Sequence, residues 1–245
     1  MKKPPKVRID TLLFEKGLVG SRQKAQALIM AGKVLVNGEM VDKAGKEVNP
    51  ESLITLKEEV PFVSRGGIKL TGALDKFNVV ADGLVIMDVG SSTGGFTDCL
   101  LKRGAKKIFA IDVGKGILDI SLRNDPRVCV LEEKNIRYMD FNEVGERVDM
   151  AVIDVSFISL EKVLPKVKEF LKEGGLVLAL IKPQFEVGKG QVGKGGIVKD
   201  PEKHKAVIDR ITEFAEGEGY KAIGHTESPI TGAKGNKEFW ILLSA

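Results

Sequence analysis

The 245-residue sequence is poor in cysteine and in histidine, with two of each. Cys99 and Cys129 lack a metal-type spacing, and two cysteines are too few for a disulfide framework, which favours a reducing cytoplasm. With only His204 and His225 to add, a zinc site built from His and Cys is not expected. We therefore expect no metal and a cytoplasmic location.

Long apolar runs are also missing. No stretch approaches the ~20 apolar residues that a membrane-spanning helix needs. The first five residues, MKKPP, carry charge but no apolar core follows them, so they do not form a secretory signal. No strongly basic amphipathic helix is evident either, so we expect no membrane partner.

Basic charge is present but unevenly placed. Residues 1–50 hold 10 Lys and Arg against 5 Asp and Glu, whereas the remainder holds 28 against 29. A chain of this length forms one large domain or two of unequal size. The charge distribution therefore predicts an anionic partner for the first fifth of the chain.

The basic region has the pattern of a small module. Helices are expected over residues 7–16 and 22–31, with Ser21 capping the second, and a strand at 34–36 leads into an Asn37-Gly38 hairpin turn. Its cations form either a solvated basic face or a phosphate-binding surface. They are Arg8, Arg22, Lys24 and Lys33.

The rest of the chain alternates apolar strands with amphipathic helices. Strands are expected at 84–88, 107–112, 128–131, 150–154, 176–181, 220–224 and 239–243, and helices at 95–102, 160–171 and 201–216. This order predicts an α/β fold with a mostly parallel sheet whose ligands bind beyond the carboxyl ends of the strands. Pro61 and Gly66-Gly67 are expected to break regular structure, which predicts domain 1–58, linker 59–66 and domain 67–245.

A glycine-rich turn, Asp88 to Phe96, follows the first of these strands. Gly90, Gly94 and Gly95 permit a close backbone approach, and Asp112, at the end of the next strand, suits a ribose diol. The turn alone could be only a tight connection.

The same segment matches the G-x-S-x-G elbow of hydrolases, with Ser92 as nucleophile and Asp154 and His225 as partners. A hydrolase elbow follows several earlier strands, however, and this turn follows the first, so we disfavour that reading.

Four charged residues form a second group. Asp154 and Lys182 each end an expected strand, Glu238 precedes the last strand, and Lys69 begins the larger domain. Each alone is an ordinary strand-end charge. Together, two lysines and two acids at one sheet edge can shift one another's protonation.

Several segments resemble a known family. SRQKAQALIMAGKVLVNGEMV is similar to the S-four-type RNA-binding domain. With it, SRGGIKL, DVGSSTGGFTDCLL, DVSFISL and KPQFEVGKGQVGKGGIV resemble the TlyA family, named both haemolysin A and ribosomal-RNA methyltransferase. The resemblance implies a seven-stranded, Rossmann-like methyltransferase sheet similar to the FtsJ (RrmJ) enzymes, and it places Lys69, Asp154, Lys182 and Glu238 on that group's catalytic tetrad.

The resemblance also implies ligands. S-adenosylmethionine is the expected cofactor, and ribosomal RNA or a ribosomal subunit is the expected partner. The residues expected at the cofactor are Asp88, Gly90, Ser91, Ser92, Thr93, Gly94, Gly95, Phe96, Asp112, Val113, Asn135 and Asp154, and those expected at RNA are Arg8, Arg22, Lys24, Lys33, Arg65 and Lys189.

The function so implied is methyl transfer to a ribose 2′-hydroxyl, that of cytidine, in ribosomal RNA. Longer relatives carry a helical C-terminal tail and modify both subunits, whereas this chain ends after its last strand, so large-subunit RNA is expected. A haemolysin-like cytolysin and a non-catalytic RNA-binding module are the alternatives.

Overall fold

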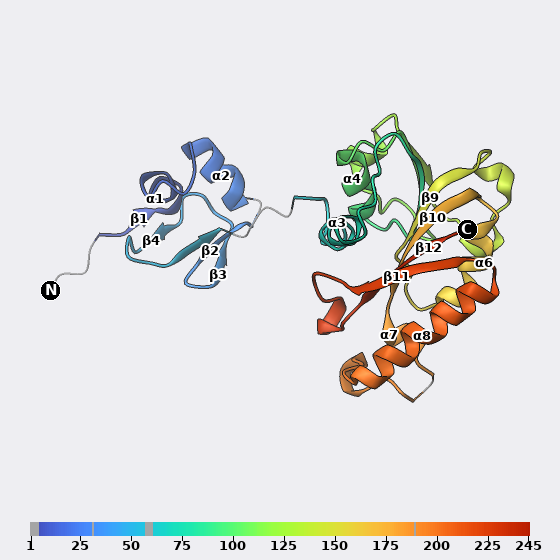
Figure 1. Cartoon of the computed structure of the whole chain (residues 1–245). Helices are drawn as coiled ribbons and strands as arrows, with labels where there is room; N and C mark the ends of the chain where they lie inside the picture. Colours follow the sequence, from blue (N-terminus) through green and yellow to red (C-terminus); the bar gives the residue numbers. More distant parts are fainter. Residues whose placement is uncertain (1–4, 31, 57–60, 189) are drawn as a thin grey trace. The chain divides into compact units, whose positions relative to one another are not determined.

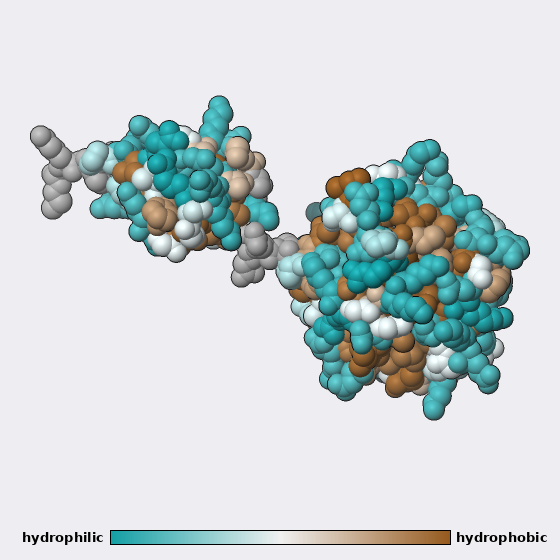
Figure 2. Space-filling model, turned by 90° about the horizontal axis from the view of Figure 1, so that it is seen from above, coloured by the Kyte–Doolittle hydropathy of each residue, from teal (hydrophilic) through white to brown (hydrophobic). Residues whose placement is uncertain are grey.

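The computed structural model describes residues 5–30, 32–56, 61–188 and 190–245, and the chain divides into two compact units, 1–59 and 60–245 (Figure 1). Residues 59–60 of the expected linker 59–66 lie outside the described residues. On the face seen in Figure 2, brown apolar patches on the larger unit are interrupted by teal polar residues.

The smaller unit has two helices and two small antiparallel sheets. Its elements are β1 (Val7–Arg8), α1 (Ile9–Glu15), α2 (Arg22–Met30), β2 (Val34–Val36), β3 (Glu39–Val41), β4 (Glu47–Val48) and β5 (Ile54–Leu56). The hydroxyl of Ser21 accepts the Lys24 N–H at 3.1 Å, as expected of a cap. Asn37 and Gly38 both have positive φ, which confirms the predicted two-residue turn.

The first predicted helix begins two residues late. Val7 and Arg8 pair with Val48 and Glu47 as strands, so α1 starts only at Ile9. Tertiary pairing has overridden the helical spacing of these residues.

The larger unit holds a seven-stranded sheet and its helices. Its strands are β6 (Val85–Val89), β7 (Lys107–Ile111), β8 (Val128–Leu131), β9 (Val148–Ile153), β10 (Leu171–Ile181), β11 (Lys221–Glu227) and β12 (Phe239–Ser244). Its α-helices are α3 (Gly66–Phe77), α4 (Gly95–Lys102), α5 (Ile120–Arg123), α6 (Leu164–Lys168), α7 (Pro183–Glu186) and α8 (Pro201–Gly217). The 3₁₀ turns are η1 (Ile136–Tyr138), η2 (Phe141–Glu143), η3 (Leu160–Lys162), η4 (Lys194–Gly196) and η5 (Ala233–Gly235).

The strand order is β11-β12-β10-β9-β6-β7-β8. The five strands β10, β9, β6, β7 and β8 run parallel to one another, whereas β12 is antiparallel to both of its neighbours, β10 and β11. This confirms the predicted α/β class and seven-stranded sheet. The chain leaves β6 toward β7 on one side and returns to β9 on the other, so the strand order reverses between β6 and β9. That reversal marks the place where ligands bind in such sheets.

Both faces of the sheet are buried. Ile86 belongs to the core that also includes Leu70 of α3 and Leu100 of α4. Its neighbour Met87 belongs to the other core, with Ile211 of α8. Figure 1 shows these helices on the two faces. The alternation follows from the two-residue period of a strand.

The prediction that Gly66-Gly67 interrupts regular structure is wrong, because these residues form the first turn of α3. A Cβ added to Gly95 would lie 3.0 Å from the Gly67 nitrogen and 3.1 Å from the Gly66 Cα. The glycines thus let the starts of α3 and α4 approach closely, instead of ending a helix.

Two further boundaries differ from the sequence prediction. The helix expected over 160–171 is divided into η3 and α6, which ends at Lys168. Strand β10 begins at Leu171 instead of residue 176, with an irregular register before Leu176.

Candidate active site

The glycine turn connects β6 to α4 and brings backbone N–H groups to the switch point. Gly90 has a φ of 84°, and a Cβ there would lie 2.6 Å from the carbonyl oxygen of Asp154. Gly94 has a φ of 95°, and its Cβ would overlap Leu122. The turn can therefore adopt this path only with glycine at both positions.

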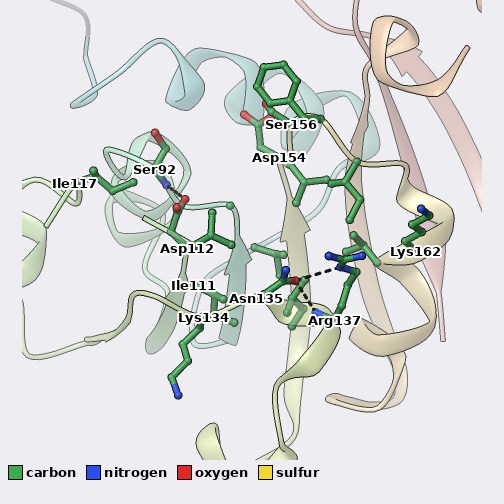
Figure 3. Close-up of a pocket in the computed structure, with 18 residues that line it drawn as sticks. Ser92, Ile111, Asp112, Ile117, Lys134, Asn135, Arg137, Asp154, Ser156 and Lys162 are labelled. Atoms are coloured by element: carbon green, nitrogen blue, oxygen red, sulfur yellow. Dashed lines mark hydrogen bonds between the residues drawn. The ribbon is translucent and has the colours of Figure 1, made fainter. Parts of the chain in front are cut away.

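A cavity of about 560 Å³ lies beside this turn, at the carboxyl ends of β6, β7 and β9 (Figure 3). Asp112 lines it, and its carboxylate accepts one N–H from Ser92 and one from Gly114, each at 2.8 Å. On another wall, the Asn135 side chain accepts the Arg137 N–H at 3.2 Å. The cavity thus offers fixed carboxylate and amide groups within apolar surroundings.

A second cavity of about 430 Å³ adjoins the first, and both are lined by Gly90, Ser92 and Asp154. Of the residues predicted at the cofactor, Gly90, Ser92, Asp112, Val113, Asn135 and Asp154 line the first cavity. The second adds Ser91, Thr93, Gly95 and Phe96. Asp88 and Gly94 line neither of these two cavities, as far as the described residues define them.

Asp88 is fully buried behind the turn. One of its carboxylate oxygens accepts the Thr97 hydroxyl at 2.6 Å, and the other has no partner among the residues described. Burial and, to a smaller extent, the charge of Asp154 raise the pKa of Asp88 to about 7, against the opposing effect of the Thr97 hydrogen bond. Asp88 therefore supports the turn from within the core.

Lys182 and Asp154 form the first of two ion pairs. Asp154 follows β9 directly, Lys182 follows β10, and these strands are neighbours in the sheet. Lys182 Nζ lies 2.5 Å from Asp154 Oδ1 and donates to the Ser156 hydroxyl at 3.0 Å. Because Lys182 is only 8% exposed, its ammonium group is held by the protein and not by water.

Lys69 and Glu238 form the second pair. Lys69 belongs to α3, and Glu238 is a buried residue that directly precedes β12. The distance from Lys69 Nζ to Glu238 Oε2 is 2.5 Å. A side chain on Gly232 would overlap the Glu238 carboxylate, so this loop is fitted around the acid. Lys69 and Asp154, one member of each pair, line the same second cavity beside the glycine turn, whereas Lys182 and Glu238 line neither of the two cavities as the described residues define them.

Sequence reasoning missed Phe157, which lines the first cavity. Its side chain is 90% exposed and its φ is +62°, a backbone conformation that bulky residues rarely adopt. Its ring lies 4.7 Å, centre to centre, from that of Phe185, which follows Lys182.

The predicted RNA-binding cations differ in their surroundings. Arg8 and Arg22 both pair with Asp10, and Lys24 is exposed while Lys33 is half-buried. In the larger unit, Arg65 is exposed, lines the second cavity and donates to the Thr231 carbonyl at 2.9 Å. Lys189 lies outside the described residues.

The histidine that the hydrolase alternative requires as a base, His225, does not lie near Ser92. His225 lies on β11 and lines a third cavity of about 340 Å³. Among the described residues, this cavity shares none with the two that contain Ser92. Ser92, Asp154 and His225 are thus not assembled into one site.

Comparison with known proteins identifies both units. Residues 62–245 match the FtsJ-like methyltransferase family, and residues 7–54 match the S4 domain. A Bacillus subtilis (strain 168) relative, YqxC, is 46% identical over 242 residues, which cover 97% of this chain and 85% of that protein. The 16S/23S rRNA (cytidine-2′-O)-methyltransferase TlyA of Mycobacterium tuberculosis (strain CDC 1551 / Oshkosh) is 44% identical over 240 residues, 97% of this chain and 90% of that protein.

A solved structure of a protein from Streptococcus thermophilus described as a hemolysin is 43% identical. It superposes with a TM-score of 0.76 over 98% of this chain and 88% of its own. Within the described part of this chain, no helix is both long and apolar enough to cross a membrane.

Proposed function

Since the chain belongs to the TlyA family, with an S4 domain and an FtsJ-like methyltransferase domain, we propose that it methylates ribosomal RNA on the 2′-hydroxyl of cytidine. The observation that supports this proposal is that two lysine–carboxylate pairs each contribute one residue, Lys69 and Asp154, to a cavity that adjoins the one beside the glycine turn. A cytoplasmic location follows from the RNA substrate and is part of the proposal.

The first cavity suits S-adenosylmethionine, which when bound supplies a methyl group on a positively charged sulfonium. Gly90 lines this cavity and lets the turn pass close to the backbone of Asp154, and Asp112 offers carboxylate oxygens to ribose hydroxyls. Lys134 and Asn135, which line this cavity, flank the place assigned to adenine. Asp154, which lines both cavities, places negative charge where the cationic donor must sit.

In this proposal Lys182 handles the hydroxyl group of the substrate. Its Nζ donates to the Ser156 hydroxyl and pairs with Asp154 by charge, although Asp154 Oδ1 accepts no hydrogen bond among the described residues, so a position on Nζ is left for the ribose oxygen. Lys182 orients that oxygen and acts in its neutral form, so its ammonium group first releases one proton to solvent and then receives the hydroxyl proton while the oxygen–carbon bond forms. Lys69, held by Glu238, binds the ribose from the other side of the cavity.

The target nucleotide must leave its stack to reach this site. The exposed ring of Phe157 offers a flat apolar surface to the freed base at the cavity wall. The S4 domain contributes basic side chains that bind the surrounding folded RNA.

Methyl incorporation from radiolabelled S-adenosylmethionine into 16S and 23S rRNA, and into both ribosomal subunits, tests the proposal. We expect incorporation by wild type at a cytidine ribose, located by mass spectrometry, and none above background by Lys182→Ala. Equal incorporation by that variant would remove the assignment of Lys182. RNA binding by wild type without incorporation would instead support a non-catalytic RNA-binding module, and red-cell lysis by both proteins would support a cytolysin.

A further inference from the structure

The smaller unit contains a buried carboxylate on which several donors converge. Asp10, near the start of α1, is 0% exposed. Arg8 donates to both of its oxygens at 3.0 Å through Nε and one terminal nitrogen. Arg22 donates at 3.1 Å and Gln26 at 2.9 Å. The Asp10 carboxylate is therefore saturated with hydrogen bonds and connects β1, α1 and α2.

The two arginines that hold Asp10 remain about half exposed, at 50% and 51% of their side chains. Arg8 uses Nε and one terminal nitrogen on Asp10, so its other terminal nitrogen is not used there. Arg22 uses a single terminal nitrogen. Asp10 thus leaves guanidinium N–H groups unused on two half-exposed side chains, whose positions it fixes from behind.

The charge of this cluster is stable across the ordinary pH range. Arg8, followed by the Gln26 and Arg22 hydrogen bonds, holds the pKa of Asp10 well below its usual range, against the effect of burial. Two cations and one anion leave a net positive charge on the outer face. Arg22 also starts α2, a nine-residue helix whose N-terminal end carries a positive partial charge, and exposed Lys24 follows it.

We propose that Asp10 is a positioning residue that holds Arg8 and Arg22 as one preformed two-arginine fork, and that this fork binds a phosphodiester of the RNA backbone. The inference rests on the proposed function for the identity of the RNA. A preformed fork loses less side-chain entropy on binding than two free arginines, and guanidinium groups bind phosphate through paired N–H donors. Asp10 itself touches no RNA.

Electrostatics alone makes the opposite prediction for Asp10, which allows a sharp test. If Asp10 only reduced the positive charge of the surface, Asp10→Asn would strengthen RNA binding, because a negative charge is lost. If Asp10 positions the fork, the same variant weakens binding although the protein becomes more positive. The sign of the change distinguishes the two cases.

The matched control is Asp42→Asn. Asp42 is an exposed acid of the same unit, and no ion pair or side-chain hydrogen bond to it is found among the described residues. It makes the same change in charge without touching an arginine. For full-length protein and in vitro transcribed 23S and 16S rRNA, we expect Asp10→Asn to weaken binding about tenfold, the loss typical of a charge-assisted hydrogen bond, and Asp42→Asn to leave it equal or tighter.

Thermal denaturation of the full chain will show whether the Asp10→Asn variant is folded. Arg22→Lys tests the proposal independently if it is not. This substitution keeps the charge but removes the fork geometry, so binding should again weaken. In methylation assays, both fork variants should raise KM for RNA and leave kcat at saturating RNA unchanged. Binding by folded Asp10→Asn or by Arg22→Lys as tight as wild type would overturn the proposal.

The binding measurement uses no cofactor, so it separates this inference from the proposed function. Weakened binding by both fork variants, with no methyl incorporation by wild type, would support the fork and contradict the methyltransferase assignment. Methyl incorporation by wild type, together with unchanged RNA binding by both fork variants, would support the methyltransferase assignment and contradict the fork.

Discussion

The two units of this protein use ion pairs in opposite ways. In the smaller unit the acid is buried and the cations are outside: Asp10 is fully covered, whereas Arg8 and Arg22 are about half exposed. In the larger unit the cations are enclosed as well, since the side chains of Lys69 and Lys182 are only 12% and 10% exposed.

This difference indicates different tasks. Exposed guanidinium groups backed by a buried acid can bind a polyanion over a broad surface. Enclosed ammonium groups, held by acids at a cavity, can contact one small group and exchange a proton with it. We therefore expect substitutions in the smaller unit to affect RNA affinity, and substitutions of the larger unit's pairs to affect the chemical step.

The strongest test of this division is Lys182→Met. Loss of the amine should lower kcat by about 10²- to 10⁴-fold, the usual contribution of a positioned acid or base, while RNA affinity stays near the wild-type value. Single-turnover methylation at saturating RNA measures the effect. The control is Lys172→Met in the same strand, because Lys172 pairs with Asp149 and its side chain is 50% exposed. A fall in kcat below tenfold for Lys182→Met would break the comparison.

The next largest effect is expected for Glu238→Gln, which leaves Lys69 enclosed without its carboxylate. Removal of one partner from a buried pair costs about 3 kcal/mol of unfolding free energy, and kcat should fall as Lys69 loses its position. Glu227→Gln is the control, since Glu227 pairs with Lys237 at the surface, where such a pair contributes below ~1 kcal/mol. Denaturant unfolding measures the loss of unfolding free energy in each variant. Equal losses in the two variants would contradict the expectation that the buried pair contributes more than the surface pair.

Phe157→Ala tests whether a residue at the cavity of the larger unit affects RNA binding without affecting the chemical step. The ring is 90% exposed, so its removal should leave the melting temperature unchanged. Loss of a stacking surface should weaken RNA binding by about 1–3 kcal/mol per base. Steady-state methylation assays measure this loss: KM for RNA should rise in Phe157→Ala while kcat changes little. Phe157→Trp should restore binding. Wild-type KM for the alanine variant would show that the ring does not contact the base.

The smallest effect concerns stability against pH. Because burial raises the pKa of Asp88 to about 7, the folded protein binds this proton more tightly than the unfolded chain does. Stability from this group is therefore greatest at low pH and is lost as pH rises from about 4 to about 7. Asp88→Asn removes this dependence, so the stability of the variant relative to wild type should increase with pH. Parallel melting curves between pH 5 and pH 8 would contradict it.

Much of the larger unit could be predicted from the sequence, because its signals are local. Gly90 and Asp112 follow apolar runs, and Lys182 and Asp154 end strands. In a parallel sheet, all such ends meet at one edge. What the sequence could not show was pairing across the chain. Nothing near Lys69 reveals that its partner is Glu238, because the fold alone brings α3 beside β12.

The missed features have physical reasons. Gly66 and Gly67 suggested a break because glycine disfavours helices, but a side chain on Gly67 would overlap Phe62 and one on Gly66 would press on Phe96 of α4. Nothing in the sequence distinguishes Asp10 from the other acids of the basic segment, because its burial depends on three donor side chains from two elements. Phe157 belongs to an apolar run, and its outward direction follows from a backbone φ that no propensity predicts.

The glycine contact between α3 and α4 makes the site vulnerable at positions without any reactive group. A methyl group on Gly95 would force the first turn of α3 outward, and Lys69 lies only one turn further along that helix. A random-mutagenesis screen for inactive variants should accordingly return Gly66, Gly67 and Gly95 alongside the four charged residues, and second-site suppressors of those glycine lesions should map to the facing helix.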